Sequence, residues 1–422
     1  MRYILAPSSK TRAVLAKALV GEPPTPQEAY ALIHVEEGPD LHALMETAVQ
    51  LRERYKGHII TYSRKVFIPL TNLCRDTCGY CTFVKQPDEP GAHTMTPEEV
   101  IAVATRGRQL GCKEALFSLG DQPERKHPTY RAWLNARGYE STLAYLADMC
   151  RLVFERTGLL PHLNPGVMEE ADIARLRPYA LSMGIMLENI SSRLLRPGMP
   201  HYRCPDKIPQ RRVATMVAAG RQRVAFTTGI LIGIGETREE RVDSLYAIRD
   251  LHLRYGHIQE VIIQNFRAKP GIPMHDHPEP SLGEMLRTLA VARLILQDMN
   301  IQAPPNLARE MYRWYLRAGI NDWGGISPLT PDYINPEAPW PEIVALQEVC
   351  QEEGLHLRER LALYPEYVRQ GTAFVPVALR PSVSMLTDET GLVRPEAEQA
   401  SPPLPSLSAS GTMSTAGGGD IP

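Results

Sequence analysis

Short apolar runs rich in Val, Ile and Leu alternate with helix-period segments from about residue 60 to residue 320. This alternation predicts parallel strands that are joined by helical crossovers and buried on both faces. We expect strands at residues 65–70, 114–119, 159–163, 181–187, 224–232, 259–265, 301–303 and 318–320. Repeating units of this kind over about 260 residues fit a complete or partial (β/α) TIM-like barrel. A doubly wound open sheet is the alternative, but no glycine fingerprint for a dinucleotide follows the first strand.

The barrel is expected to occupy residues 60–326. Residues 1–59 form an N-terminal helical segment, because apolar residues such as Leu41, Leu44 and Ala48 recur at helical spacing. Residues 327–394 begin with a proline-rich connector, and we expect helices around 342–353 and 356–363 in a C-terminal extension that closes the barrel. Residues 395–422 are rich in Pro, Ser, Gly, Ala and Thr, which predicts a disordered tail.

Composition excludes several functional classes. The chain has 43% hydrophobic and 22% charged residues, and its 46 Lys and Arg nearly balance 48 Asp and Glu. A net charge of −2 provides no electrostatic footprint for wholesale nucleic-acid binding. No uncharged apolar run approaches the ~20 residues that cross a bilayer, and Lys10, Arg12 and Lys17 interrupt any signal-peptide core. We therefore expect a cytoplasmic protein without nucleic-acid or membrane partners.

Three of the seven cysteines lie within eight residues. Cys74, Cys78 and Cys81 form a C-x3-C-x2-C motif in the loop after the first expected strand, and Gly79 allows close wrapping of that loop. Three thiolates on one loop can surround a polynuclear metal site. The isolated cysteines are expected to be small core residues: Cys112, Cys150, Cys204 and Cys350.

A [4Fe–4S] cluster is usually held by four cysteines, so three would leave one iron open to a substrate. The alternatives are structural zinc, for which His93 could be the fourth ligand, and thiols without a metal. The absence of a second cysteine pair favours the cluster with three Cys ligands and one open iron.

This motif, with Tyr80 before its last cysteine, resembles the radical S-adenosylmethionine superfamily. The resemblance implies that the open iron chelates the amino and carboxylate groups of S-adenosyl-L-methionine, and that reductive cleavage releases a 5′-deoxyadenosyl radical. An external electron donor is then required. An organic radical of this kind needs a dry barrel mouth to contain it.

Further cofactor contacts are implied at the ends of successive strands. Gly120, Asp121 and Glu124 resemble the stretch that contacts the methionyl amino group, although Asp121 stands where a second glycine is common. Asn164, Glu188 and Asn189 suit the ribose hydroxyls and the methionyl carboxylate. Gly233 and Glu236 belong to a stretch resembling the adenine-contacting segment. Ordinary turn or capping roles are the alternative for each of these residues.

At finer grain the chain resembles the ring-closing first-subunit family of 7,8-didemethyl-8-hydroxy-5-deazariboflavin synthase, which makes the chromophore of coenzyme F-420. The resemblance covers about residues 60–365 and is carried by four segments: 69–83, 119–124, 261–270 and 321–328. It implies an ammonia-releasing carbon–nitrogen lyase that cyclises a hydroxybenzyl-ribityliminouracil adduct. It also implies a companion radical enzyme that first joins tyrosine's side chain to 5-amino-6-ribitylaminouracil.

Substrate and catalytic residues are expected near the last strand ends. Amide and cationic side chains suit a uracil ring and a ribityl chain, and an aromatic residue suits a phenol; the candidates are Asn265, Arg267, Lys269, Asn321 and Trp323. Asp322 or His162 could accept protons during ring closure. His275, Asp276 and His277, flanked by prolines, are expected to form a solvated loop.

Other functions share parts of this pattern. The companion coupling subunit and related radical enzymes of menaquinone- or biotin-type pathways would have the same cluster and barrel. A zinc-stabilised binding module without catalysis is the alternative from a different class.

Overall fold

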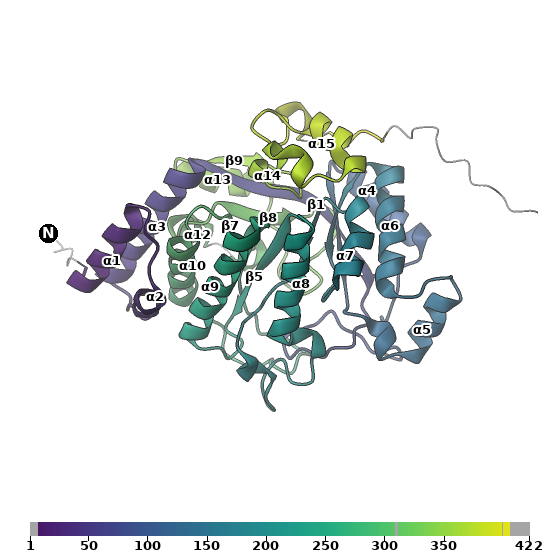
Figure 1. Ribbon diagram of the computed structural model, residues 1–422, viewed down its shortest axis with the longest axis horizontal. Helices are drawn as coiled ribbons and strands as arrows, with labels where there is room; N and C mark the ends of the chain where they lie inside the picture. Colours follow the sequence, from purple (N-terminus) through teal and green to yellow (C-terminus); the bar gives the residue numbers. More distant parts are fainter. Residues whose placement is uncertain (1–6, 309–310, 399, 406–422) are drawn as a thin grey trace, which may run out of the picture.

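Eight parallel strands close into a barrel in the computed structural model, which describes residues 7–308, 311–398 and 400–405 (Figure 1). Each strand pairs with the next in chain order, and the eighth pairs with the first. The strands are β1 (Ile59–Thr71), β2 (Glu114–Leu119), β3 (Leu160–Asn164), β4 (Ser182–Gly184), β5 (Phe226–Ile232), β6 (Ile258–Asn265), β7 (Ile301–Gln302) and β8 (Asp322–Ile326). The barrel prediction is confirmed in its complete form, and the open sheet is excluded.

The predicted position of the last strand is wrong. Residues 318–320 form the turn after a short helix, where Gly319 has a φ of +90° and its N–H donates to the Leu316 carbonyl. The strand begins at Asp322, three residues after Gly319. It contains two consecutive glycines, which weaken the hydrophobic pattern that would identify it from sequence. Asn321, Asp322 and Trp323 therefore lie where a strand begins, not where one ends.

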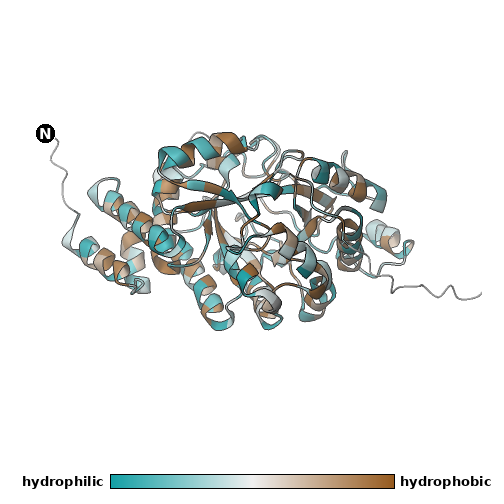
Figure 2. Cartoon of the chain, turned by 90° about the horizontal axis from the view of Figure 1, so that it is seen from above, coloured by the Kyte–Doolittle hydropathy of each residue, from teal (hydrophilic) through white to brown (hydrophobic). Residues whose placement is uncertain are grey.

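Helices surround the barrel and connect its strands (Figure 1). They are α4 (Pro97–Gln109), α5 (Pro128–Asn135), α6 (Thr142–Thr157), α7 (Glu170–Leu176), α8 (Pro209–Arg221), α9 (Arg238–Tyr255), α10 (Leu282–Leu296), α11 (Pro305–Ala308) and α12 (Tyr312–Arg317). Capping boxes begin α4 at Thr96 and α9 at Thr237, as the sequence predicts. Figure 2 shows largely hydrophobic central strands and outer helices that carry both hydrophobic and hydrophilic residues.

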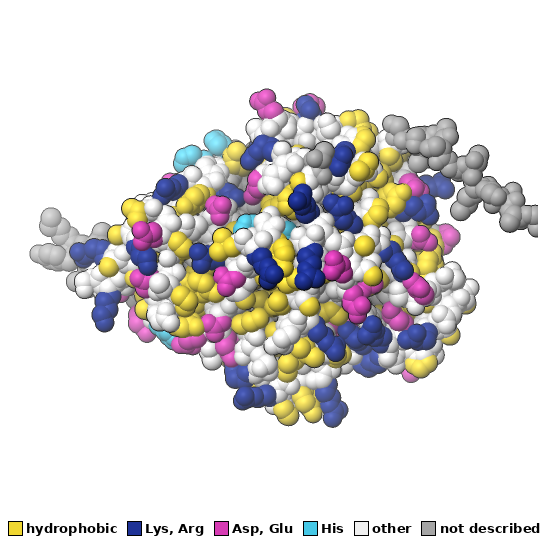
Figure 3. Space-filling model, viewed as in Figure 1, with side chains coloured by type: hydrophobic (Ala, Val, Ile, Leu, Met, Phe, Trp, Pro, Cys, Tyr) yellow, Lys and Arg dark blue, Asp and Glu magenta, His cyan; other side chains and the backbone are white. Residues whose placement is uncertain are grey.

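Three helices precede the barrel, which confirms the helical prediction for this part of the chain: α1 (Ser9–Leu19), α2 (Pro26–Ile33) and α3 (Pro39–Lys56). They lie beside α9 and α10, at the left of Figure 1. On α3, the buried Arg52 donates to the Leu316 carbonyl at 2.8 Å and so attaches this helix to α12. Among the described residues, no helix is both long and apolar enough to cross a membrane. Figure 3 shows positive and negative side chains interspersed on one face of the molecule.

The C-terminal extension contains α13 (Ile343–Glu352), β9 (His356–Glu359), α14 (Pro365–Arg369) and α15 (Arg380–Leu386). The helix expected at 356–363 is wrong, because β9 pairs in parallel with the first residues of β1. These residues of β1 extend past the start of β2, so their backbone groups need a partner. Pairing with β1 therefore overrides the local helix preference of this segment.

Part of the expected tail is ordered. Lys113 Nζ donates to the Glu398 carbonyl at 2.5 Å, and Arg108 Nε donates to the Pro402 carbonyl at 3.1 Å. The prediction of disorder from residue 395 is therefore wrong for residues 395–398 and 400–405. Residues 399 and 406–422 lie outside the described residues.

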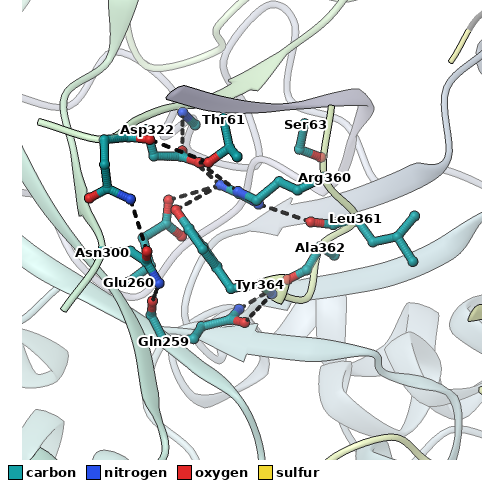
Figure 4. Close-up of polar contacts among 12 residues, drawn as sticks. Thr61, Ser63, Gln259, Glu260, Asn300, Asp322, Arg360, Leu361, Ala362 and Tyr364 are labelled. Carbon is teal, nitrogen blue, oxygen red and sulfur yellow. Dashed lines mark hydrogen bonds and ion pairs between the residues drawn. The ribbon is translucent and has the colours of Figure 1, made fainter. Parts of the chain in front are cut away.

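A buried ionic network closes the end of the barrel where the strands begin (Figure 4). Arg360, which follows β9, binds both carboxylate oxygens of Asp322 at 2.6 and 2.8 Å. Its guanidinium also contacts a Glu260 oxygen at 3.2 Å and the Tyr364 hydroxyl at 2.9 Å. Each of these side chains is at least nine-tenths buried, so a single cation from the extension compensates two carboxylates inside the barrel.

We expect Arg360→Leu to lower the free energy of unfolding by about 3–5 kcal/mol, because it leaves two buried carboxylates without a cation. Arg358→Leu is the matched control. Its ion pairs with Asp388 and Glu398 are partly exposed, so its cost should be at most about 1 kcal/mol. Urea unfolding monitored by circular dichroism measures both values. Equal losses for the two variants would contradict a dominant role for the buried network.

Candidate active site

A cavity of about 230 Å³ lies at the end of the barrel where the strands finish. It is bordered by the cysteine loop after β1 and by residues after β2, β3, β4 and β6. All three thiols of the C-x3-C-x2-C motif line it: those of Cys74, Cys78 and Cys81. Because parallel strands end at one edge of a barrel, residues far apart in sequence converge here.

Backbone amides surround the first of these thiols. The N–H groups of Asp76 and Asp121 donate to Cys74 Sγ at 3.3 and 3.2 Å. Gly120 makes this approach possible, because a Cβ at this position would overlap the Leu73 carbonyl oxygen and lie 2.7 Å from Cys74 Cβ. N–H donors of this kind stabilise a thiolate ligand.

Burial raises the pKa of the Cys74 and Cys81 thiols above the ordinary value. A hydrogen bond with Cys204, together with burial, raises the pKa of Cys78. Three neutral thiols at neutral pH would each lose a proton on coordinating a metal, since a bound cation ionises its thiol ligands outright. The donor set therefore suits a soft, sulfur-binding metal centre.

Cys204 lies beside this group. Its Sγ, the Sγ of Cys78 and a carboxylate oxygen of Asp76 are all within 4.8 Å of one another. Cys204 is buried, as predicted, but it packs at the candidate metal site instead of in the general core. The carboxyl group of Asp76 is buried, and its partner is the carboxyl group of Asp206. Burial and the neighbouring Asp206 raise the pKa of Asp76 to about 10.

Two cations and two anions form the facing wall. Lys207 Nζ lies 2.8 Å from a Glu188 oxygen, and Arg212 Nη2 lies 2.9 Å from an Asp206 oxygen. Burial and the neighbouring Arg212 each lower the pKa of Lys207. Glu188 and other anionic groups outweigh them, so the pKa of Lys207 is held well above its ordinary value. This wall can bind a group that carries both a positive and a negative charge.

The sequence did not reveal most of this wall. Asp206, Lys207 and Arg212 lie after β4 and at the start of α8, in a stretch without a recognisable motif. Glu188 has a φ of +61° and was predicted from its place at a strand end. Asp76 lies within the cysteine motif, but an acidic residue in a loop does not by itself predict a place beside a metal site.

Eight of the predicted cofactor and substrate residues line the cavity. They are Tyr80, Gly120, Asp121, Asn164, Glu188, Asn265, Arg267 and Lys269. The Tyr80 hydroxyl lies 2.9 Å from His201 Nε2, and Lys269 Nζ donates to the Ile334 carbonyl at 2.7 Å. Asp121 accepts from the Val167 N–H at 3.0 Å and pairs with Arg75.

Four predicted cofactor residues lie outside the cavity wall and stabilise the loops near it. Glu124 accepts from the Thr142 N–H and hydroxyl at the start of α6. Asn189 accepts from the Ser191 N–H in a local turn. Glu236 accepts from the N–H groups of Gly233 and Ile234, both at 2.8 Å. Position 233 requires glycine, because its φ is +88° and a Cβ there would lie 2.5 Å from Pro280 Cδ. In the structure these four residues therefore order the loops around the cavity.

Three residues predicted from the last strand lie at the opposite end of the barrel. Asp322 pairs with Thr61 on the neighbouring strand β1. Thr61 lies about ten residues before the cysteine loop, which is about 30 Å along an extended strand. Asp322 is fully buried and bound by Arg360, while Asn321 binds Arg293 and Asn300. Trp323 is buried and packs edge-on against Tyr312. The catalytic role expected for Asp322, and the substrate roles of Asn321 and Trp323, are therefore wrong.

A second chamber of about 200 Å³ lies deeper in the barrel. Phe83, Asn164 and Gln264 line both this chamber and the outer cavity, so the two spaces are neighbours that share a wall. Alternate residues of the strands face into it, which places His162 on its wall together with Thr227, Glu260 and Gln302. Aromatic residues form another part of the wall: Phe67, Phe83, Tyr333 and Trp340.

His93 does not approach the thiols. Its exposed ring lies 3.1 Å from Glu99 near the start of α4, and it does not line the cavity. The alternative in which His93 completes a zinc site is therefore wrong. His275 and Asp276 are largely exposed, as expected for a solvated loop.

Comparisons with known proteins agree with this geometry. The profile of the Radical SAM superfamily matches residues 68–246. The 7,8-didemethyl-8-hydroxy-5-deazariboflavin synthase of Methanopyrus kandleri is 50% identical over 336 residues, covering 80% of this chain and 100% of that protein. The FO synthase of Mycobacterium tuberculosis strain H37Rv is 48% identical over 407 residues, covering 92% of this chain. The present chain spans only 47% of that FO synthase, which is about half its length.

Solved structures share the fold at low sequence identity. Methylornithine synthase has a TM-score of 0.65 at 20% identity, covering 82% of this chain and 97% of that chain. A maturase of the [FeFe]-hydrogenase has a TM-score of 0.68 at 17% identity, covering 84% of this chain and 77% of that chain.

We expect Gly120→Ala to reduce the iron bound after anaerobic reconstitution to a small fraction of the wild-type amount, because the added methyl displaces the Leu73–Cys74 backbone. Gly138→Ala is the control, since nothing lies within 4 Å of a Cβ built there. Its positive φ of +78° should cost only about 1 kcal/mol. Iron analysis and thermal unfolding of both proteins test this. Full iron content in Gly120→Ala would contradict the close packing described here.

Proposed function

The chain belongs to the radical S-adenosylmethionine superfamily and, within it, to the family of 7,8-didemethyl-8-hydroxy-5-deazariboflavin synthases, and on that premise we propose that it catalyses the ring closure that forms this deazaflavin. The observation that carries the proposal is 50% identity along the whole Methanopyrus kandleri enzyme, combined with three thiols on one cavity wall. The substrate would be the adduct 5-amino-5-(4-hydroxybenzyl)-6-(D-ribitylimino)-5,6-dihydrouracil.

Membership of the superfamily implies a [4Fe–4S] cluster and S-adenosylmethionine. Cys74, Cys78 and Cys81 would hold the cluster, and the amide donors at Cys74 support a thiolate there. When bound, the pair supplies a carbon-centred radical that removes a hydrogen atom from the substrate. The remaining steps depend on how this chain's residues bind the two small molecules and exclude water.

The charged wall suits the methionyl group of S-adenosylmethionine. Lys207 and Arg212 would bind its carboxylate, and Glu188 and Asp206 would face its cationic groups. Tyr80, Asp121 and Asn164 border the same cavity and would contribute to cofactor binding. Gly233 and Glu236 would act indirectly, by ordering the loop that follows β5.

The inner chamber suits the adduct. Its aromatic side can pack on the phenol and uracil rings, and its polar side can bind the ribityl hydroxyls. Phe67 and Trp340 are already stacked, with ring centroids 5.3 Å apart. Gln264 lines both spaces and would offer its amide group to the uracil. Asn265, Arg267 and Lys269 border the outer cavity, where the Asn265 amide would be the nearest further contact.

Ring closure joins the ribitylimino nitrogen to a carbon of the phenol ring and expels the 5-amino group as ammonia. The reaction is therefore a carbon–nitrogen lyase reaction as well as a cyclisation. His162 is the proposed proton acceptor, because it lines the inner chamber and Asp322 does not.

The adduct must be supplied by a second enzyme. A companion radical enzyme would couple tyrosine's side-chain fragment to 5-amino-6-ribitylaminouracil, and an external donor would provide electrons. FO synthases about twice as long as the matched region support this division, because they have room for a second domain of similar size.

An anaerobic assay tests the proposed function. Holoprotein supplied with reductant, S-adenosylmethionine and the adduct should give deazaflavin fluorescence, 5′-deoxyadenosine and ammonia. Adduct formation from tyrosine and 5-amino-6-ribitylaminouracil, without deazaflavin, would instead identify the companion activity. A colourless protein with one tightly bound zinc would overturn both.

We expect Cys78→Ala to abolish S-adenosylmethionine cleavage and to reduce bound iron from about four atoms per chain, because it removes one of only three cluster ligands. Cys112→Ala is the control, since Cys112 is an equally buried cysteine away from the cavity. It should keep both iron and cleavage. Retained 5′-deoxyadenosine production in Cys78→Ala would contradict the assigned ligands.

A further inference from the structure

His162 has a well-defined hydrogen-bond partner on one side of its ring. The Nδ1 atom lies 2.6 Å from the Ser182 hydroxyl, and that hydroxyl donates to the Ala362 carbonyl at 2.8 Å. The three residues come from β3, β4 and the C-terminal extension. Ser182 and Ala362 are almost completely buried, so water does not compete for these hydrogen bonds.

The direction of both hydrogen bonds follows from counting protons. The Ala362 carbonyl accepts from Gln259 Nε2 at 3.0 Å as well as from Ser182. Both contacts of the Ser182 hydroxyl are hydrogen bonds only when its single proton is used on Ala362, because a carbonyl oxygen only accepts. The Ser182 oxygen then offers His162 only lone pairs, and Nδ1 must carry a proton. Burial lowers the pKa of His162 to about 4, so the ring is neutral at neutral pH. A neutral imidazole protonated at Nδ1 has an unprotonated Nε2.

The unprotonated nitrogen faces the inner chamber. Gly184 lines this chamber, and a Cβ built on it would lie 3.6 Å from His162 Nε2. No hydrogen bond to Nε2 is found among the described residues, so its lone pair is available to a substrate.

The charged groups around His162 are compensated by other partners. Glu114 on β2 is bound by Lys65 on β1 at 2.7 Å, and Arg360 binds Asp322. Glu260 lines the same chamber and is bonded to Thr227 and Arg360. No carboxylate hydrogen-bonds to the His162 ring in the part of the chain that the structure describes.

We propose that Ser182 is a positioning residue: together with the Ala362 carbonyl it holds His162 in the tautomer whose Nε2 accepts the proton released during ring closure. This inference rests on the proposed function. In that reaction the adduct loses ammonia and two hydrogens. One hydrogen leaves as an atom to the cofactor-derived radical. The other leaves as a proton to Nε2, and its electron passes to a one-electron acceptor of the iron–sulfur type. The imidazolium then returns its proton to solvent when the product leaves.

Nitrogen NMR of the oxidised holoprotein tests the tautomer without any substrate. The signal of His162, assigned from the spectrum of His162→Gln, should show a protonated Nδ1 and an unprotonated Nε2. Ser182→Ala should shift the ring toward the other tautomer. Thr47→Val should leave it unchanged, because that buried hydroxyl bonds only within α3. A protonated Nε2 in the wild type, or an unchanged signal in Ser182→Ala, would overturn the inference.

Turnover tests the consequence. His162→Gln should lower deazaflavin formation by about 100-fold while S-adenosylmethionine cleavage continues, as expected when a general base is lost. Ser182→Ala should lower it by a smaller factor, with partial rescue in Ser182→Thr, which keeps the hydroxyl. In the wild type, deazaflavin formed per cleaved cofactor should stay constant from pH 8 to pH 6, because the base form persists above its pKa of about 4.

The outcomes separate the two proposals. If the tautomer is as stated but the wild type forms no deazaflavin, the proposed function fails and the base role fails with it. If deazaflavin forms normally in both His162→Gln and Ser182→Ala, the base role is overturned and the proposed function stands.

Discussion

The parallel pairing of β1 with β2 and β8 is the interaction on which the other features depend. It closes the sheet, so that all eight strands finish at one rim. The cysteine loop, the charged wall and the strand-end amides meet there only because the closed ladder aligns them. The length of β1 has a second effect. Its first residues extend past the start of β2 and bind β9, which brings Arg360 to the opposite end of the barrel.

Much of the fold could be predicted from hydrophobic patterning. Strands buried on both faces read as apolar runs, and capping boxes marked the helices between them. The errors occurred where that signal is weak. β8 contains an aspartate and two glycines, so its apolar neighbour at 318–320 was chosen instead. β9 is a strand because an exposed edge of β1 pairs with it, and no local pattern reports such an edge.

The candidate site was predictable where chemistry depends on local spacing. The three cysteines are defined by their own motif, and residues at correctly placed strand ends reached the cavity. Asp322 was misplaced because an error of a few residues in a strand boundary moves a side chain to the other end of a barrel. Lys207 and Arg212 come from a loop and a helix start, where only the folded chain shows which cations converge. Cys204 looked like a core residue, and its neighbour Cys78 is distant in sequence.

The hydrogen bond from Ser182 to the Ala362 carbonyl bears on where the barrel domain ends along the chain. The residues that follow β9 supply Arg360 to the barrel floor and the acceptor for Ser182, so the C-terminal extension contributes to the interior of the barrel. This strand and the turn after it therefore complete the packing of the barrel interior. In a longer polypeptide, a junction placed directly after β8 would separate Ser182 from the Ala362 carbonyl. A workable junction must lie beyond the extension.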